Sequence, residues 1–158
     1  MQAWDLAHII THYVNGKGEN VSHKKLQKLL YYVEAWHLVN FNSPLIKEDF
    51  EAWIHGPVIP SVYHKLKNFG FNNLDVINDE EGTADEQIAK IIEDNKIQDK
   101  VEFISMVLNK YGCLSSFELE ILSHSEKPWI DARKGCAPHE RCTNIISKEA
   151  ILQYYSTL

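Results

Sequence analysis

The chain has 158 residues, of which 44% are hydrophobic and 24% charged, and its net charge is −6. These values are typical of one soluble globular domain over residues 1–158, and they exclude a chain that is disordered throughout. No apolar run reaches the length of about 18 residues that spans a membrane, and no secretory signal opens the chain. Three cysteines, an odd number, cannot make a disulfide framework, so we expect a cytoplasmic protein.

The first two predicted elements are helices. An apolar stripe from Leu6 to Tyr13 follows one helix face, and Gly16 ends that helix. Ser22 is placed to cap a second helix, which is apolar around most of its circumference, as a central helix would be. On its apolar face we expect His37 to be a hydrogen-bonded core histidine. Its first turns carry three lysines where the helix dipole slightly disfavours cations: Lys24, Lys25 and Lys28. They form either a basic contact point or, more commonly in proteins, a solvated cluster.

The next predicted elements are a strand and a sharp corner. Alternation from Phe50 to Ile54 has the period of a strand. Leu45 and Ile46 are predicted to pair with it as a small β-hairpin near residues 44–55. After the corner, Pro60 suits the first turn of a short helix, because its missing N–H would have no partner there in any case.

Helices fill the rest of the predicted fold. Two capping boxes, each a Ser or Thr followed three residues later by Glu, open helices at Thr83 and Ser115. Further helices are predicted over residues 101–111 and after Ser147, whereas residues 135–143 are predicted to be a loop. The predicted fold class is therefore mainly α: a single compact helical domain with a small hairpin.

The negative charge is concentrated in one segment. Residues 78–102 carry nine acidic residues against three lysines, and the rest of the chain is balanced. Because binding to phosphates needs a concentrated basic face, we do not expect direct contact with nucleic acid. We hypothesise that Glu80, Glu81, Asp85 and Glu86 contact a basic partner. The alternative is a solvated helix and its leading loop.

Patterns for catalysis and metal binding are weak. No complete phosphate-binding fingerprint, Gly-x-Ser-x-Gly or His-Glu-x-x-His motif occurs, so we expect neither an enzyme nor a cofactor. Cys136, His139 and Cys142 could wrap a zinc ion, with Cys113 or His124 as the fourth ligand. Structural zinc sites usually show paired Cys-x-x-Cys motifs, which are missing. We therefore predict no metal and a surface loop with two ordinary thiols.

Three segments together resemble one known family. They are Leu26 to Trp36, Phe50 to Pro60 with Tyr63, and Leu122 to Trp129 with Ala132 and Arg133. In this order and spacing the chain resembles the Panacea domain, also called the SocA-like antitoxin domain. The Trp-x-x-Gly-Pro-Val block that begins at Trp53 is the most specific part. The loop from Cys136 to Cys142 does not belong to this pattern.

The resemblance implies an antitoxin of a toxin–antitoxin system, which neutralises a cognate toxin by direct binding. Family partners include toxins similar to alarmone synthetases and others that block translation, and some homologues lie in prophages. One branch acts as an adaptor that hands its toxin to a AAA+ protease, which is the alternative function for this chain. We expect no membrane partner, because no apolar run is long enough to span a membrane.

The central motif also has a physical interpretation of its own. Gly56 can adopt backbone angles that are closed to other residues, and Pro57 stiffens the chain that follows. Trp53, His55 and Tyr63 surround this corner, and aromatic side chains on a rigid turn are good anchors for a partner. These five residues are therefore candidate partner-binding residues. The alternative is that the corner only packs the domain together, with Trp53 and Tyr63 in the core.

Overall fold

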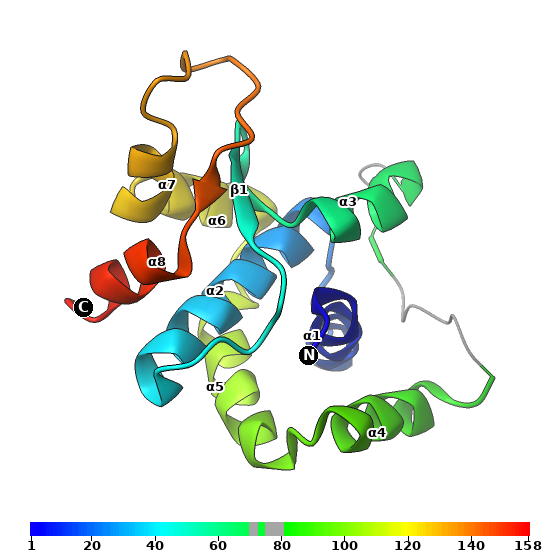
Figure 1. Cartoon of the computed structure of the whole chain (residues 1–158). Helices are drawn as coiled ribbons and strands as arrows, with labels where there is room; N and C mark the ends of the chain where they lie inside the picture. The colour runs from blue at the N-terminus through cyan, green and yellow to red at the C-terminus, as the bar shows by residue number, and fades with distance from the viewer. Residues whose placement is uncertain (70–72, 75–80) are drawn as a thin grey trace.

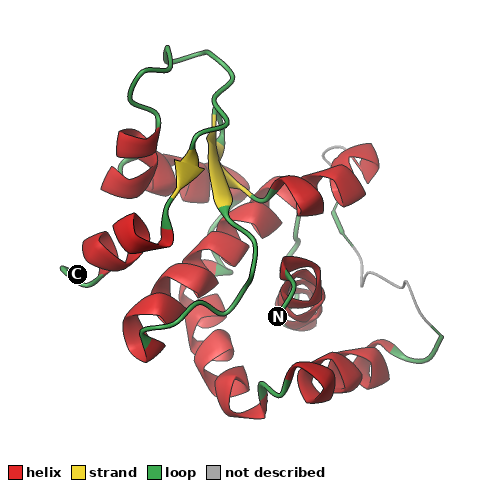
Figure 2. Ribbon diagram, in the orientation of Figure 1, coloured by secondary structure: helices red, strands yellow, loops and turns green. Residues whose placement is uncertain are grey.

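The computed structural model describes residues 1–69, 73–74 and 81–158. The elements follow one another in this order: α1 (Ala3–Gly16), α2 (His23–Phe41), β1 (Phe50–Trp53), β2 (Gly56–Val58), α3 (Pro60–Leu66), the 3₁₀ turn η1 (Lys67–Phe69), α4 (Ala84–Asn95), the 3₁₀ turn η2 (Gln98–Lys100), α5 (Val101–Tyr111), α6 (Ser116–His124), α7 (Lys127–Ala132), β3 (Ile145–Ile146) and α8 (Lys148–Tyr155). The strands form one antiparallel sheet in the order β2-β1-β3. The predicted mainly α fold is confirmed (Figures 1 and 2).

Helix α2 runs through the middle of the molecule and packs against α1, α5, α6, α8 and β2 (Figure 1). Every residue from Lys25 to Leu38 except Trp36 is buried, which confirms the predicted central helix. Ser22 caps it, because its hydroxyl accepts a hydrogen bond from the Lys25 backbone N–H at 3.2 Å. His37 is buried and hydrogen bonded through Nδ1 to the Ser43 carbonyl at 2.8 Å, as predicted for a core histidine.

The core beside α2 is aromatic and encloses the carboxyl group of Glu126. Tyr32 stacks on Tyr111 with the ring centres 4.2 Å apart, and Tyr155 packs edge-on against Tyr32. The hydroxyls of Tyr32 and Tyr155 both donate to the carboxylate of Glu126, which is 5% exposed. Burial raises the pKa of Glu126 and outweighs the effect of these two hydrogen bonds. The start of α7 is thereby tied to α2 and α8.

The predicted helix starts are confirmed. Thr83 and Ser115 each form the expected capping box with the glutamate three residues later. The hydroxyl of Ser147 accepts a hydrogen bond from the Ala150 backbone N–H at 3.1 Å and caps α8. Pro60 lies in the first turn of α3. These signals are reliable because each cap involves only residues three apart in the chain.

The predicted pairing of the hairpin is wrong. Strand β1 pairs with β2, with Trp53 opposite Gly56, and not with Leu45 and Ile46. The backbone N–H groups of Leu45 and Ile46 donate instead to the buried carboxylate of Glu34 on α2, at 2.9 and 3.1 Å. Because this carboxylate satisfies the donors that a strand partner would use, the segment remains irregular. The hairpin therefore spans residues 50–58, and β3 adds a third strand that the sequence did not indicate.

The lysines at the start of α2 do not form a solvated cluster. Lys25 is 5% exposed and Lys28 is 2% exposed, because α6 and β2 pack over this end of the helix. The position of Lys28 determines the site described below.

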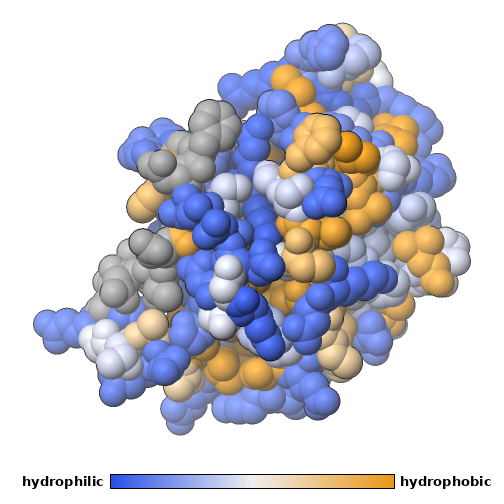
Figure 3. Space-filling view, turned by 180° about the vertical axis from the view of Figure 1, so that it is seen from behind, coloured by the Kyte–Doolittle hydropathy of each residue, from blue (hydrophilic) through white to orange (hydrophobic). Residues whose placement is uncertain are grey.

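The outer surface is mixed in polarity. Figure 3 shows hydrophobic side chains in separate patches among hydrophilic ones on the rear face. Exposed large apolar residues include Met106 on α5 and Phe117 and Ile121 on α6. Among the described helices, none combines the length and the apolar character needed to cross a membrane.

Candidate functional site

Three candidate residues from the corner motif lie around one pocket. Trp53, His55 and Tyr63 line a cavity of about 300 Å³ between α2, the β1–β2 hairpin and α3. Lys28 from α2 and Arg141 from the loop before β3 line it too; a basic contact point was one of the two interpretations of Lys28, whereas Arg141 was not predicted to belong to a site. We refer to this cavity, lined by these five residues among others, as the corner pocket.

The family-specific glycine makes room for the lysine. Gly56 has φ +106°, a conformation that favours glycine, and a Cβ atom there would lie 2.5 Å from the Cε atom of Lys28. The Oγ atom of Ser123 would be 2.9 Å away on the other side. Lys28 Nζ donates to the carbonyl of Pro57 at 3.3 Å. Because Gly56 and Pro57 are buried, they shape the pocket and do not themselves present a surface.

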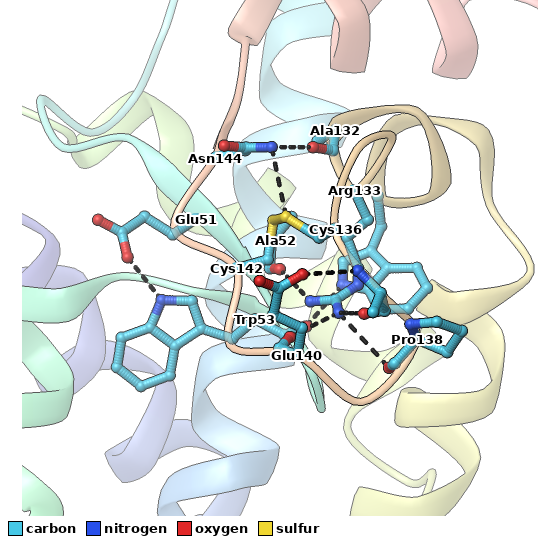
Figure 4. The surroundings of a disulfide bond; sticks show 12 residues. Glu51, Ala52, Trp53, Ala132, Arg133, Cys136, Pro138, Glu140, Cys142 and Asn144 are labelled. Atoms are coloured by element: carbon cyan, nitrogen blue, oxygen red, sulfur yellow. Dashed lines mark hydrogen bonds between the residues drawn. A yellow bond between two sulfur atoms is a disulfide. The ribbon is translucent and has the colours of Figure 1, made fainter.

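The aromatic residues of the corner are only half-buried, so they are not core residues. The rings of Trp53 and Tyr63 meet edge to face with their centres 4.8 Å apart. The indole Nε1 of Trp53 donates to the Glu51 carboxylate at 2.6 Å (Figure 4). The guanidinium carbon of Arg141 lies 5.8 Å from the centre of a Trp53 ring. These contacts hold the rings in place while leaving part of each accessible.

Burial dominates the electrostatics of the pocket. It lowers the pKa of Lys28 from 10.5 to about 7, although the charge of Glu120 acts in the opposite direction. Burial also lowers the pKa of His23 and of His124, and nearby lysines add to the effect. Burial alone would raise the pKa of Glu120, but the hydrogen bond and charge of His55, at 2.9 Å, lower it overall. The pocket therefore contains a buried amine that holds its proton much less tightly than an exposed lysine does.

The third family segment supports the corner from behind. The Trp129 indole stacks on His124 with the ring centres 4.0 Å apart and donates to the Trp53 carbonyl at 2.9 Å. The guanidinium of Arg133 is buried and donates to the Ala52 carbonyl at 2.8 Å (Figure 4). The two side chains thus join α6 and α7 to β1.

The cysteine loop differs from the prediction. Cys136 and Cys142 form a disulfide, with their Cα atoms 6.1 Å apart, and are not two free thiols (Figure 4). The loop folds back because Arg133 donates to the carbonyls of Ala137 and Glu140, at 3.0 and 2.8 Å. This pairing depends on the position of Arg133, which sequence spacing does not reveal. Within the described residues, no group of three or more His, Cys, Asp and Glu side chains is placed to hold a metal ion.

Of the acidic candidates, Asp85 and Glu86 lie on α4, which packs against α1 (Figure 1). Glu80 lies outside the described residues, and Glu81 is exposed. Asp85 pairs with His12 at 3.0 Å, and Glu86 closes the capping box of α4. Two of the four candidate carboxylates therefore already have partners within the chain.

Comparison with known proteins agrees with the three-segment pattern. The sequence model of the family described as "Antitoxin SocA-like, Panacea domain" matches residues 26–130. The chain belongs to this family. The match runs from α2 into α7 and so includes Lys28 and the pocket residues of the hairpin and α3, whereas His23 and Lys24 precede the matched range. Arg141 lies beyond the matched range.

A curated relative carries the same description. "Antitoxin SocA" of Caulobacter vibrioides (strain NA1000 / CB15N) is 36% identical over 112 residues, which are 69% of this chain and 58% of that protein. The chain thus spans less than two thirds of the length of this relative. No solved structure shows a significant match to the chain.

Proposed function

We propose that this protein is a cytoplasmic antitoxin that neutralises a cognate toxin by direct binding, and that it is not an enzyme. The observation that carries the proposal is the place of the most family-specific segment. Trp53, His55 and Tyr63 line an accessible pocket and are not enclosed in the core. The match to the Panacea domain and the name of the Caulobacter relative support the same role.

The corner is suited to anchoring a partner. Binding orders side chains, and this ordering costs about 0.5–1.5 kcal/mol for each flexible side chain that becomes immobilised. At the corner much of that order is already present, because Trp53 is held by Glu51 and by the edge of Tyr63. Rigid, half-exposed aromatic rings are typical of binding hot spots. A toxin that covers the corner would gain apolar burial with little loss of side-chain freedom.

The proposed partner is a toxin encoded beside this protein, alarmone-synthetase-like or otherwise directed at translation. A toxin that acts on RNA presents a basic face, which the acidic segment around α4 complements in charge. The charge would act mainly on the rate of association, and the corner on the lifetime of the complex.

The test is co-expression with the toxin-like protein encoded by the adjacent gene. We expect the protein to restore growth and to co-purify with the toxin, and Trp53→Ala to weaken both effects. Phe117→Ser is a matched control, because Phe117 is 70% exposed on α6 and does not line the corner pocket. Thermal melts of both variants would verify the fold.

Absence of both growth rescue and co-purification would contradict the proposal. If the protein instead acts as an adaptor that delivers the toxin to a protease, the co-expressing cells should show a different result. The toxin would then disappear rapidly, and inactivation of a AAA+ protease would restore its level.

A further inference from the structure

The corner pocket holds a buried amine that has no carboxylate partner. Among the described residues, Lys28 Nζ makes one hydrogen bond, to the Pro57 carbonyl at 3.3 Å, and no ion pair. An ammonium group has three donors, and a buried cation is costly unless a negative group lies beside it. The carboxylate of Glu120 is hydrogen bonded to His55. Lys28 therefore has donors left for an anion that enters the pocket.

Further positive charge surrounds this amine, although the chain as a whole is negative. Lys24 and Arg141 both line the pocket, and the Arg141 guanidinium lies over Trp53. His23 lines it as well, and its buried Nδ1 atom has no hydrogen-bond partner among the described residues. The pocket thus combines two cationic side chains, a buried amine and an unsatisfied ring nitrogen. This composition favours a negatively charged ligand.

The walls of the pocket favour a flat apolar body. The Trp53 and Tyr63 rings form one side, and Val58 and Ile54 add aliphatic surface. The cavity of about 300 Å³ is at the lower end of the range for small-molecule sites. It has room for an aromatic ring that carries a short acidic arm.

We propose that the corner pocket binds a small aryl carboxylate. Its carboxylate pairs with Lys28 and Arg141, and its ring packs against Trp53 and Tyr63. Of the two cations that pair with the ligand, Arg141 is exposed and only Lys28 is buried, so the buried part of the pocket balances the single negative charge of a carboxylate, whereas a phosphate monoester carries about −1.5 to −2 at neutral pH. This inference goes beyond the proposed antitoxin role and does not depend on it.

The direct test is calorimetric titration of the full chain with indole-3-acetate. Two ligands serve for comparison: indole-3-acetamide, which is neutral, and phenyl phosphate, which carries more negative charge. We expect saturable binding of the carboxylate, with the amide weaker by about tenfold or more, because a charge-assisted hydrogen bond is lost. Lys28→Met should lower the affinity for indole-3-acetate to the level of the affinity for indole-3-acetamide. Lys25→Met is the matched control, because Lys25 is also buried on α2 but does not line the corner pocket.

Several results would overturn the proposal. They are equal affinity for the acid and the amide, unchanged binding by the Lys28→Met variant, tighter binding of phenyl phosphate, or no binding of indole-3-acetate. Circular dichroism of each variant would exclude loss of the fold as the cause of weakened binding.

Proton uptake provides a second measurement. The carboxylate pairs with the protonated amine, and because burial lowers the pKa of Lys28 to about 7, binding near pH 8 should take up protons. Charged and titratable groups face this amine from four parts of the chain: His23 and Lys24 on α2, His55 on the hairpin, Glu120 and His124 on α6, and Arg141 on the disulfide loop. Burial lowers the pKa of His23 and of His124, and although burial acts to raise the pKa of Glu120, the hydrogen bond with His55 lowers it overall, so these three groups gain no proton near pH 8.

Near pH 8 the uptake is therefore assigned to Lys28. The measured heat of binding should differ between two buffers of different ionisation enthalpy, and the Lys25→Met control should show the same difference. Equal heats in the two buffers would show that Lys28 does not take part. Titration of the toxin-bound protein adds a separate result, because loss of indole-3-acetate binding there would place toxin and ligand on the same surface.

Discussion

Replacing Lys28 by methionine should stabilise the folded protein at neutral pH, and the gain should shrink as the pH rises. Methionine has nearly the same length and shape as the buried part of lysine but carries no charge. The Lys28 side chain is 2% exposed, and burial lowers its pKa from 10.5 to about 7. In the unfolded chain the amine keeps its ordinary pKa.

The direction in which stability changes with pH follows from proton binding. Between pH 7 and 10.5 the unfolded chain holds the proton of Lys28 more tightly than the folded chain does, so stability rises with pH. Each unit of pKa difference corresponds to about 1.4 kcal/mol, so the buried amine costs about 5 kcal/mol at low pH. Loss of the hydrogen bond to the Pro57 carbonyl offsets about 1 kcal/mol of what the methionine gains. Lys28→Met should therefore be more stable than the parent by about 3 kcal/mol at pH 7. At pH 9 this gain should be smaller by about 2 kcal/mol.

The assay is chemical denaturation of the parent and of Lys28→Met at both pH values. The difference between the unfolding free energies of the two proteins at each pH cancels the contributions of groups such as Glu126, which titrate in both proteins. Lys47→Met is a control, because Lys47 is exposed and its removal should change stability little at either pH. A Lys28→Met variant less stable than the parent at pH 7 would refute the reasoning. A difference independent of pH would also refute it, because it would show that water reaches the amine in the folded state.

Three further predictions follow from other parts of the structure. Trp36→Ala should lower the stability by about 2–3 kcal/mol, because Trp36 is half-buried and its indole donates to the Tyr111 hydroxyl at 2.9 Å; an unchanged thermal melt would contradict this. Cys136→Ser should cost about 2 kcal/mol in denaturant titrations of the oxidised protein, because a short loop is no longer closed, and little when both proteins are reduced, because Cys136 is only half-buried. Glu81→Gln, Glu93→Gln and Asp94→Asn together should slow association with a basic toxin at low salt and have less effect at high salt, whereas identical association rates would show a merely solvated surface.

The sequence by itself determined the local structure and the family. Helix starts at Ser22, Thr83, Ser115 and Ser147 could be predicted because each cap joins residues three apart. The central position of α2 could be predicted from apolar residues around most of its circumference. The Trp-x-x-Gly-Pro-Val block indicated where the candidate site lies, although not that its aromatic rings are half-exposed.

The tertiary structure decided which distant groups meet. Three lysines near the start of α2 were visible in the sequence, but the burial of Lys28 depends on Gly56, which lies 28 positions further along the chain and leaves space for the lysine side chain. The hairpin partner of β1 was likewise decided by Glu34, whose carboxylate takes the backbone donors of Leu45 and Ile46. Such contacts cannot be predicted from periodicity, because periodicity describes one element at a time. The corner pocket exists only because α2, the hairpin, α3 and the disulfide loop come together in space.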